Sequence, residues 1–490
     1  MPYVVIFLGF MLFSSANWVV RKFGPVTYEQ IMFHLNMPFH SEIRLILSYL
    51  QNTVMTGAIV VLVLWLLFSG KYRLKWSSIE RIRTKIYEYR WVICLIWFVF
   101  CVAYYCWRMN VWAMITYRSY KREMSNFYEQ YYVLPQNAEV SFPHQKRNLI
   151  LIFMESMEAT FAQTPEHNYY QDDLIPQLHK LAQENISFSD SQYLGGEFPI
   201  DGTQWTQAGL FAKTCGAPIQ LPIREVNLIR PKGEFYPNAW CLYDILRTQG
   251  YEESFLIGSN GNFAGMNHFV KTHGKQRFLD TLHYAREQGI KLSYKQKSKS
   301  IADKELFVQA KEELNHLAEL GKPFVFTIMT LDTHFGSQEF SGDVCGYKYG
   351  TEKNFKNVVS CSDFQIGQFV EWLKQQPFYA NSTIVLLGDH QMMRGEFEPE
   401  MKRRTLNIFI NSAVSAIAEK NRVFTPFDIY PSVIESMGGK ISGHRLGLGT
   451  SLFANLPTLT ESKMTVDEMN IEVRKSSKIY DWLLYGKEIK

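Results

Sequence analysis

The segment Asn148-Leu-Ile-Leu-Ile-Phe-Met-Glu155 decides the fold of this 490-residue chain. It contains six consecutive apolar residues followed directly by a carboxylate. An apolar run of this length is typical of a strand that is buried on both faces. Similar runs follow at residues 254–257, 323–329, 382–387 and 405–410, with helical patterns between them at 175–185, 304–320 and 362–374. This alternation predicts an α/β fold with a mainly parallel sheet covered on both faces.

In such a sheet, ligands bind beyond the C-terminal ends of the strands. Glu155 directly follows the first run, and Asp389 and His390 follow the run at 382–387. We therefore expect all three side chains at one edge of the sheet. Carboxylate oxygens and an imidazole nitrogen suit a divalent cation, although each residue alone also fits a helix cap or a loop. Together they predict a metal site.

Thr206 is the candidate nucleophile. It lies in Gly202-Thr-Gln-Trp-Thr-Gln-Ala-Gly209, which opens an amphipathic helix. The free N–H groups at a helix N-terminus bind phosphate, and a metal can hold a threonine oxygen as the alkoxide. The alternative is that Thr203 or Thr206 is an N-cap, which is the commoner use of threonine at this position.

Four further residues are candidates for substrate contacts. His334 follows the run at 323–329 and should lie at the same sheet edge. Trp205 precedes the nucleophile and would either pack against substrate or fill the core. His268 and His273 are weaker candidates on the segment 262–274. Each histidine also fits a loop residue that its neighbours satisfy.

Three apolar stretches lie in the first 110 residues, at 3–20, 53–68 and 91–107. Each is near the roughly 17–20 residues that a helix needs to cross a bilayer. Buried core helices are the alternative, but three such stretches with none later favour membrane spans. The first lacks a basic n-region and a clear cleavage site, so we interpret it as a retained span and not as a signal peptide.

Basic residues predict the orientation of the spans. The loop 69–90 carries Lys71, Arg73, Lys75, Arg81, Arg83, Lys85 and Arg90. The positive-inside rule places this loop in the cytoplasm. The loop 21–52 and everything after the third span then lie outside. Five basic residues on the outer side depart from the rule: Arg21, Lys22, Arg118, Lys121 and Arg122.

The cysteines and the net charge limit the possible compartment and partners of the protein. Four of the seven cysteines, Cys215, Cys241, Cys345 and Cys361, follow the spans. They permit two disulfides in an oxidising compartment, and the closest-spaced pairing is Cys215–Cys241 with Cys345–Cys361. Four reduced core cysteines are the alternative. The net charge is only +4 and no dense basic face stands out, so a nucleic-acid partner is not expected.

The order of these residues resembles a known family. Glu155, Thr206, the Asp332-Thr-His334 turn and Gly388-Asp389-His390 occur as in the sulfatase-like branch of the alkaline phosphatase superfamily. More narrowly, the chain resembles lipoteichoic acid synthase and the phosphoglycerol transferases of osmoregulated periplasmic glucans. The resemblance extends from about residue 29 to about residue 453. Supporting segments lie at 29–35, 205–209, 263–265, 272–274, 426–431 and 446–452.

The resemblance implies one Mn²⁺ or Mg²⁺ held by Glu155, Thr206, Asp389 and His390. It implies that Thr206 attacks phosphatidylglycerol, that diacylglycerol leaves, and that a phosphoglycerol-threonine intermediate passes its group to a glycan or polymer hydroxyl. His334 would contact the head group. The implied location is a bacterial inner membrane, with the catalytic domain in the periplasm. The chain departs from the family in lacking a Trp-x-Arg pair and in carrying Met266 near a position where related enzymes have a basic residue.

We expect a transmembrane region at 1–107, linker helices at 108–147, a sulfatase-like catalytic domain at 148–455 and a C-terminal extension at 456–490. A true sulfatase is disfavoured, because the nearest match to its C/S-x-P-x-R motif is Cys215-Gly-Ala-Pro218-Ile-Gln, with proline one place late and no arginine. A phosphoethanolamine transferase would share the fold, metal and threonine. A non-catalytic glycan-binding membrane protein would have no need for the complete ligand set.

Overall fold

The computed structural model describes residues 2–23, 27–28, 31, 43–68, 84–220, 234–274, 276–281, 283, 300–334, 342–346, 348–350, 354–393, 397 and 401–486. The chain forms two compact units, which are Met1–Tyr28 with Phe39–Ser119, and Glu29–Pro38 with Tyr120–Lys490. Much of the predicted outer loop, and residues 69–83 of the predicted cytoplasmic loop with most of its basic residues, lie outside the described residues.

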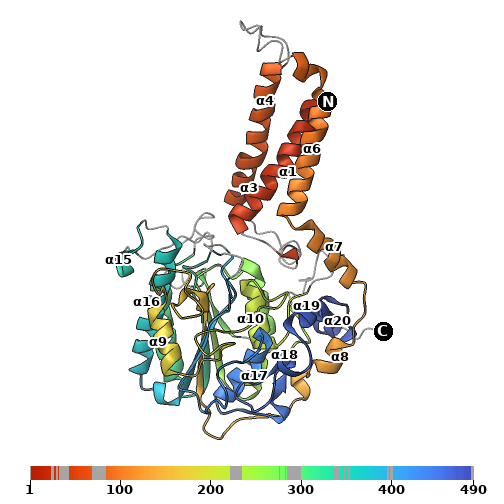
Figure 1. Ribbon diagram of the computed structural model, residues 1–490. Helices are drawn as coiled ribbons and strands as arrows, with labels where there is room; N and C mark the ends of the chain where they lie inside the picture. Colours follow the sequence, from red (N-terminus) through yellow and green to blue (C-terminus); the bar gives the residue numbers. More distant parts are fainter. Residues whose placement is uncertain are drawn as a thin grey trace. The chain divides into compact units, whose positions relative to one another are not determined.

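The first unit is helical in its described part (Figure 1). Its elements are α1 (Pro2–Phe23), α3 (Ile43–Tyr49), the π-helical turn η1 (Leu50–Met55), α4 (Thr56–Phe68), α6 (Arg90–Arg108) and α7 (Val111–Tyr120). Three stretches, Pro2–Arg21, Ile46–Leu66 and Arg90–Arg108, are long and apolar enough to cross a membrane, judged by length and composition. Their number and order agree with the three predicted spans.

The second of these stretches begins earlier than the sequence predicts. The predicted stretch starts at Thr53, after the polar residues Gln51 and Asn52. In the structure, Asn52 Nδ2 donates to the Ser48 carbonyl at 2.7 Å and Thr53 Oγ1 donates to the Tyr49 carbonyl. Because these polar groups bond to their own helix, they do not interrupt it.

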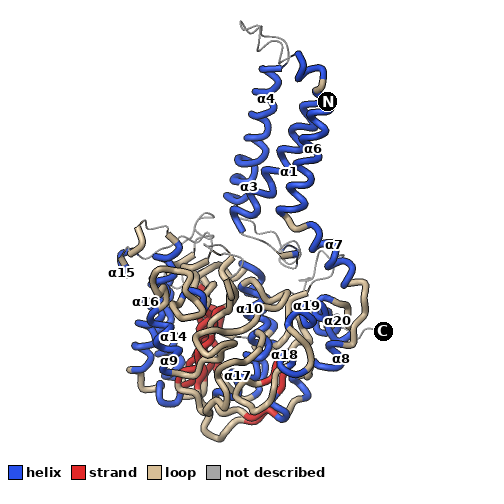
Figure 2. Tube along the Cα trace, viewed as in Figure 1, coloured by secondary structure: helices blue, strands red, loops and turns tan. Residues whose placement is uncertain are grey.

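A six-stranded sheet forms the centre of the second unit (Figure 2). The order is β4-β3-β5-β2-β6-β7, with bounds Arg277–Leu279, Glu252–Ile257, Phe324–Met329, Asn148–Met154, Ser382–Gly388 and Asn407–Ile410. The strands from β4 to β6 are parallel, and β7 runs antiparallel to β6. The sheet is therefore mainly parallel, as predicted. The short strand β4 was not among the predicted strands.

Helices cover both faces of the sheet (Figure 1). Leu149 and Leu151 of β2 pack into one apolar cluster, whereas Ile150 and Ile152 pack into the other. The first cluster includes residues of α10 (Thr206–Cys215), α11 (Leu242–Thr248), α12 (Met266–Thr272) and α17 (Pro426–Ser436). The second includes residues of α9 (Pro176–Glu184), α14 (Asp303–Glu319) and α16 (Phe355–Lys374). Burial on both faces explains the unbroken apolar run in β2.

Segments before residue 148 and after residue 455 pack in the same unit. Tyr128 and Tyr480 join the first apolar cluster. Tyr128 belongs to α8 (Phe127–Tyr131) and Tyr480 to α20 (Lys478–Tyr485). The helices α18 (Leu459–Ser462) and α19 (Val466–Arg474) directly precede α20. The short strand β1 (Val140–Ser141) pairs with β8 (Lys440–Ile441), and β9 (Arg445–Leu446) pairs with β10 (Gly449–Thr450). Helix α15 spans Gly342–Cys345.

Candidate metal centre

The predicted ligands meet where two neighbouring strands end. β2 and β6 pair in parallel with Met154 opposite Gly388, so Glu155 and Asp389 leave the sheet side by side. The Ser156 N–H donates to Asp389 Oδ1 at 2.7 Å, and the Asp389 N–H donates to the Met154 carbonyl at 3.1 Å. The two loops that carry the acidic side chains are therefore bonded directly to each other.

The four residues predicted as ligands form one cluster. Ligand atoms of Glu155, Asp389 and His390 all lie within 4.8 Å of one another. His390 Nε2 is 3.4 Å from Glu155 Oε1 and 3.5 Å from Asp389 Oδ2. Thr206 Oγ1 is 3.3 Å from Glu155 Oε2 and 3.4 Å from His390 Nε2. The acidic side chains and the histidine are at most 4% exposed, so water does not screen their charges.

Burial and mutual charge perturb each of these groups. Burial alone would raise the pKa of Glu155, but the charges of His334 and His390 outweigh it and hold that pKa at about 2. Burial, and next the charge of Glu155, raise the pKa of Asp389 to about 7. Burial would lower the pKa of His390, yet Asp389 and Glu155 raise it to about 9. The ionised form of the buried carboxylates is thus stabilised by positive charge beside them. A divalent cation would also supply such charge.

The donor set fits such a cation. Asp389 Oδ2 is fully buried and has no hydrogen-bond partner among the residues that the structure describes, so an oxygen is left that a metal could satisfy. His390 Nδ1 bonds to the Gln391 carbonyl at 2.7 Å. With Nδ1 donating to that carbonyl, Nε2 faces the carboxylates and is the nitrogen that a metal would bind in place of a proton. Two carboxylates, one imidazole and one hydroxyl are ligands that Mg²⁺, Mn²⁺ or Zn²⁺ accept.

Thr206 is the first residue of α10, after Trp205 at the N-cap position. The side chain of Trp205 makes no capping hydrogen bond. The first N–H groups of a helix have no partner within the helix, so they stay available to an anion at this end. The N-cap alternative for Thr206 therefore does not hold. Thr203 is instead used locally, because its Oγ1 donates to the Ile200 carbonyl at 2.7 Å.

Helix α10 is fixed to the metal-ligand loop at two further points. A Cβ at Gly209 would lie 2.0 Å from the Asp389 carbonyl oxygen, so only glycine allows this approach. One turn later, Lys213 Nζ donates to the same carbonyl at 2.9 Å. Lys213 also pairs with Glu197, and both side chains are only 1% exposed. These contacts set the position of Thr206 relative to Asp389.

Gly209, Lys213 and Glu197 were not predicted from the sequence as site residues. The available signal was one lysine in the otherwise apolar stretch Leu210-Phe-Ala-Lys213. Lysine is rarely buried without a partner, so that pattern could have indicated a buried ion pair. The position of its partner, 16 residues earlier in the chain, follows no local pattern.

The candidates for substrate contacts occupy different settings. His334 lies close enough to Glu155 for its charge to lower the pKa of that carboxyl. Its ring also stacks edge-on against Phe263, at 5.5 Å between centroids. His268 lies on α12, which begins three residues after Phe263 in the chain. Trp205 is only 3% exposed and belongs to the apolar core, so it fits the core-filling alternative.

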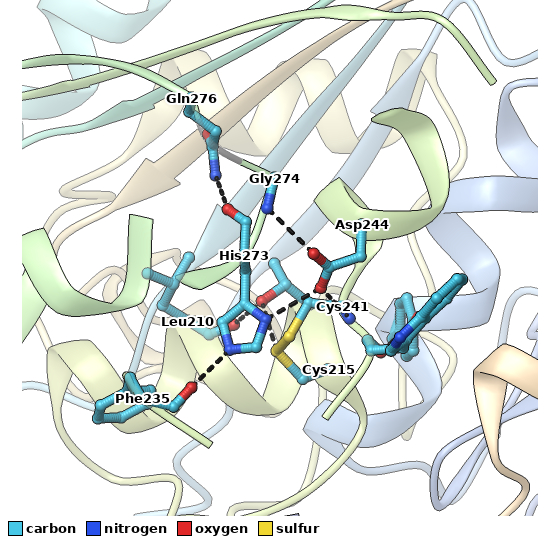
Figure 3. Close-up of a disulfide and its surroundings, with 11 residues drawn as sticks. Leu210, Cys215, Phe235, Cys241, Asp244, His273, Gly274 and Gln276 are labelled. Carbon is cyan, nitrogen blue, oxygen red and sulfur yellow. Dashed lines mark hydrogen bonds and ion pairs between the residues drawn. A yellow bond between two sulfur atoms is a disulfide. The ribbon is translucent and has the colours of Figure 1, made fainter. Parts of the chain in front are cut away.

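His273 lies beside the Cys215–Cys241 disulfide and not among the metal ligands (Figure 3). Its Nδ1 bonds to Asp244 at 2.9 Å and its Nε2 bonds to the Phe235 carbonyl at 2.8 Å. Both ring nitrogens are occupied and the ring is buried, so this geometry offers nothing to a substrate. Cys241, Asp244 and His273 are close enough to suggest a second metal site, but the Cys241 sulfur is bonded to Cys215.

The structure pairs the four cysteines as their spacing suggested. Cys215 bonds to Cys241 and Cys345 bonds to Cys361. The first disulfide joins the last residue of α10 to the N-cap of α11, so it holds the end of the helix opposite Thr206. Three cysteines of the first unit, Cys94, Cys101 and Cys106, are free.

Curated proteins resemble this chain in sequence. The phosphoglycerol transferase I of Xanthomonas axonopodis pv. citri is 26% identical over 322 residues, which cover 64% of this chain and 43% of that protein. The protein of the same name from Escherichia fergusonii is 31% identical over 259 residues, covering 52% of this chain and 32% of its own length. The chain thus spans less than half the length of these curated relatives.

Two solved structures are similar to this chain at lower sequence identity. A lipoteichoic acid synthase from Listeria monocytogenes is 18% identical, with a TM-score of 0.49, and the match covers 65% of this chain and 79% of that one. The integral membrane protein lipooligosaccharide phosphoethanolamine transferase A from Neisseria meningitidis is 13% identical, also with a TM-score of 0.49, over 97% of this chain and 87% of that one.

The family assignment rests on the match to the sulfatase family, which covers residues 147–438 and therefore well over half of the chain. That range contains every strand of the six-stranded sheet. It also contains Glu155, Thr206, Asp389 and His390. The chain belongs to the sulfatase family.

Proposed function

We propose that this chain is a membrane-anchored phosphotransferase that moves phosphoglycerol from phosphatidylglycerol to a hydroxyl group of a glycan or polymer. The observation that carries the proposal is the position of the Thr206 hydroxyl. It lies 3.3 Å from Glu155 and 3.4 Å from His390, at the start of a helix. A threonine used only as a cap would have no reason to adjoin a buried cluster of metal-ligand type.

The proposed reaction has two half-reactions. Thr206 Oγ1 loses its proton and bonds to phosphorus, while the bond from phosphorus to the diacylglycerol oxygen breaks and diacylglycerol leaves with a proton. An acceptor hydroxyl then attacks the phosphoglycerol-threonine and restores the Thr206 hydroxyl as it gives up its own proton. Covalent capture of this kind separates the lipid-dependent step from the acceptor-dependent step.

The chain supplies the groups that this chemistry needs. Glu155, Asp389, His390 and Thr206 would hold one divalent cation, Mn²⁺ or Mg²⁺. When bound, such a cation stabilises a threonine alkoxide and the charge on phosphate oxygens. The free N–H groups of the first turn of α10 would bind those oxygens. We propose His334, beside Glu155, as the contact to the head group, with His268 as a second candidate.

Three observations support the location and the donor. The three apolar helices are long enough to anchor the chain in a membrane. The two disulfides suit an oxidising compartment such as the periplasm. The curated relatives carry the name phosphoglycerol transferase I. We therefore propose the bacterial inner membrane, with three spans in residues 1–107, linker helices at 108–147, a periplasmic catalytic domain at 148–455 and an extension at 456–490.

The test compares Thr206→Ala with Thr203→Ala in the full-length protein. Each variant is reconstituted with Mn²⁺ in vesicles that contain phosphatidylglycerol labelled in its acyl chains, and diacylglycerol release is measured. Thr206→Ala should lower release by at least ~10³-fold, as expected when a nucleophile is removed. Thr203→Ala should retain most of it, because the Thr203 hydroxyl already bonds to the Ile200 carbonyl.

Comparable release from wild type and Thr206→Ala would show that the nucleophile lies elsewhere. A parallel sample with labelled phosphatidylethanolamine distinguishes the two head groups. Release from that lipid alone would replace the proposed donor and indicate a phosphoethanolamine transferase.

A further inference from the structure

The short helix α7 (Val111–Tyr120) presents an apolar face that no described residue covers. It begins three residues after α6 ends at Arg108, and Asn110 between them has a φ of 48°. This left-handed residue turns the chain out of the direction of α6. Trp112 is 75% exposed and Ile115 is 54% exposed. Figure 1 shows α7 continuing the chain from the end of α6.

The opposite face of α7 is packed against protein. Tyr117 is only 1% exposed, and its ring lies 4.6 Å from that of Tyr28 within the same compact unit. At 100° per residue, Trp112, Ile115 and Arg118 fall within roughly 120° of the helix surface, away from Tyr117. Within the described residues, one face of this helix therefore packs against Tyr28 and the other is exposed.

Positive charge accompanies the exposed apolar residues. Arg108 and Arg118 are exposed, and neither has a hydrogen bond or ion pair within the part of the chain that the structure describes. Trp107, next to Arg108, is 73% exposed. If the third span leads outward, Arg118 lies on the side where the positive-inside rule disfavours basic residues. A local function for this charge would explain the departure.

We propose that the exposed face of α7 formed by Trp112, Ile115 and Arg118, together with Trp107 and Arg108 at the end of α6, is a binding surface for anionic phospholipid in the outer leaflet. Indole rings favour the interface between headgroups and acyl chains, and arginine binds phosphate through paired hydrogen bonds. The face adjoins the end of a candidate span, so a bilayer surface is the partner within reach. This lipid-binding surface is separate from the site of the transfer reaction. It rests on the proposed function in one respect: the proposed donor, phosphatidylglycerol, is anionic and would be concentrated there.

The charge of the lipid gives a measurable selectivity. A basic residue close to an anionic membrane contributes about 1 kcal/mol, which corresponds to about fivefold per arginine. With two arginines, the lipid at this face should be enriched in phosphatidylglycerol by at least about fivefold over its share of the bilayer. Neutral glutamines at both positions should bring the ratio back to that of the bulk.

The experiment uses photocrosslinking in the full-length protein. The photoreactive residue p-azidophenylalanine replaces the exposed Trp112 in one sample. In the control it replaces the buried Tyr117, a site whose size suits this side chain. The proteins carry Thr206→Ala so that no donor is consumed, and the vesicles contain phosphatidylglycerol and phosphatidylcholine at one to four. Mass spectrometry identifies the crosslinked lipid.

We expect lipid adducts from position 112 and few from position 117. We also expect the enrichment in phosphatidylglycerol to disappear in Arg108→Gln/Arg118→Gln, whose exposed positions should tolerate the change. Equal adduct yields from both positions, or a wild-type lipid ratio equal to the bulk, would overturn the inference. Neither readout depends on turnover, so a failure here is distinguishable from a failure of the proposed transfer reaction.

Discussion

Replacing Gly209 by alanine should separate the stability of this protein from its activity. Gly209 lies inside α10, three residues after Thr206. An added Cβ would lie 2.0 Å from the carbonyl oxygen of Asp389 and 2.9 Å from its carbonyl carbon. Ordinary C···O contacts begin at about 3.3 Å. The helix and the ligand loop must therefore move apart by roughly 1 Å, and the obstructing atoms are backbone atoms that cannot rotate away.

The expected cost in stability is moderate. Overpacking of this kind costs about 1–3 kcal/mol, and alanine returns up to about 1 kcal/mol because it is the better helix former. The net loss of about 0–3 kcal/mol is below a typical folding free energy of about 5–15 kcal/mol. The fold should survive. The geometry of the site should not, because metal–ligand distances tolerate only about 0.2 Å and a 1 Å misplacement can lower turnover about 100-fold.

The assay measures diacylglycerol release, Mn²⁺ affinity by titration calorimetry and the melting temperature for wild type and Gly209→Ala. The same substitution at Gly367 is the control, because Gly367 lies within α16 and its Cβ would meet side-chain atoms of Gln177 at 2.9 Å. Gly367→Ala should leave turnover and metal affinity unchanged. Wild-type turnover in Gly209→Ala would refute the argument that this close approach sets the position of Thr206.

Three further outcomes are expected. Lys213→Met should lower the free energy of unfolding by about 3–5 kcal/mol because it leaves the Glu197 carboxylate buried without a cation. The double variant Lys213→Met/Glu197→Gln should recover much of that loss in urea unfolding. Strictly additive losses from the two substitutions would contradict the ion pair. Burial raises the pKa of Glu253 to about 9, above its ordinary 4.5, so the folded chain keeps a proton that the unfolded chain loses and stability falls as pH rises from 4.5 to 9. Glu253→Gln should therefore raise the melting temperature more at pH 9 than at pH 4.5, and an equal change at both would count against this. The Cys215–Cys241 disulfide joins residues 26 apart in the sequence. Removing it with the double variant Cys215→Ser/Cys241→Ser should lower the free energy of unfolding by about 3.5 kcal/mol, because the unfolded chain gains entropy. A loss below about 1 kcal/mol in guanidinium unfolding would indicate that this disulfide does not restrict the unfolded chain.

Much of the site could be predicted from the sequence because its ligands directly follow buried strands. Parallel strands end at the same edge of a sheet, so the sequence predicted Glu155 and Asp389 at one edge. The structure added that their strands, β2 and β6, are neighbours. The apolar spans were equally visible, since a bilayer requires long apolar runs. The start of the second span was predicted too late, because hydropathy does not show that Asn52 and Thr53 bond to their own helix.

The sequence by itself determined the class of fold, the number of apolar helices and the residue types that gather at the sheet edge, since each depends on a local pattern of a few to twenty residues. Only the tertiary structure decided that α10 approaches the Asp389 carbonyl at Gly209, that Lys213 pairs with Glu197, and that His273 is held by Asp244 instead of facing a substrate. These contacts join segments far apart in the chain, and their energies depend on burial and on distances of a few ångströms. No local pattern carries that information, because a buried charge is stable only where folding brings its partner.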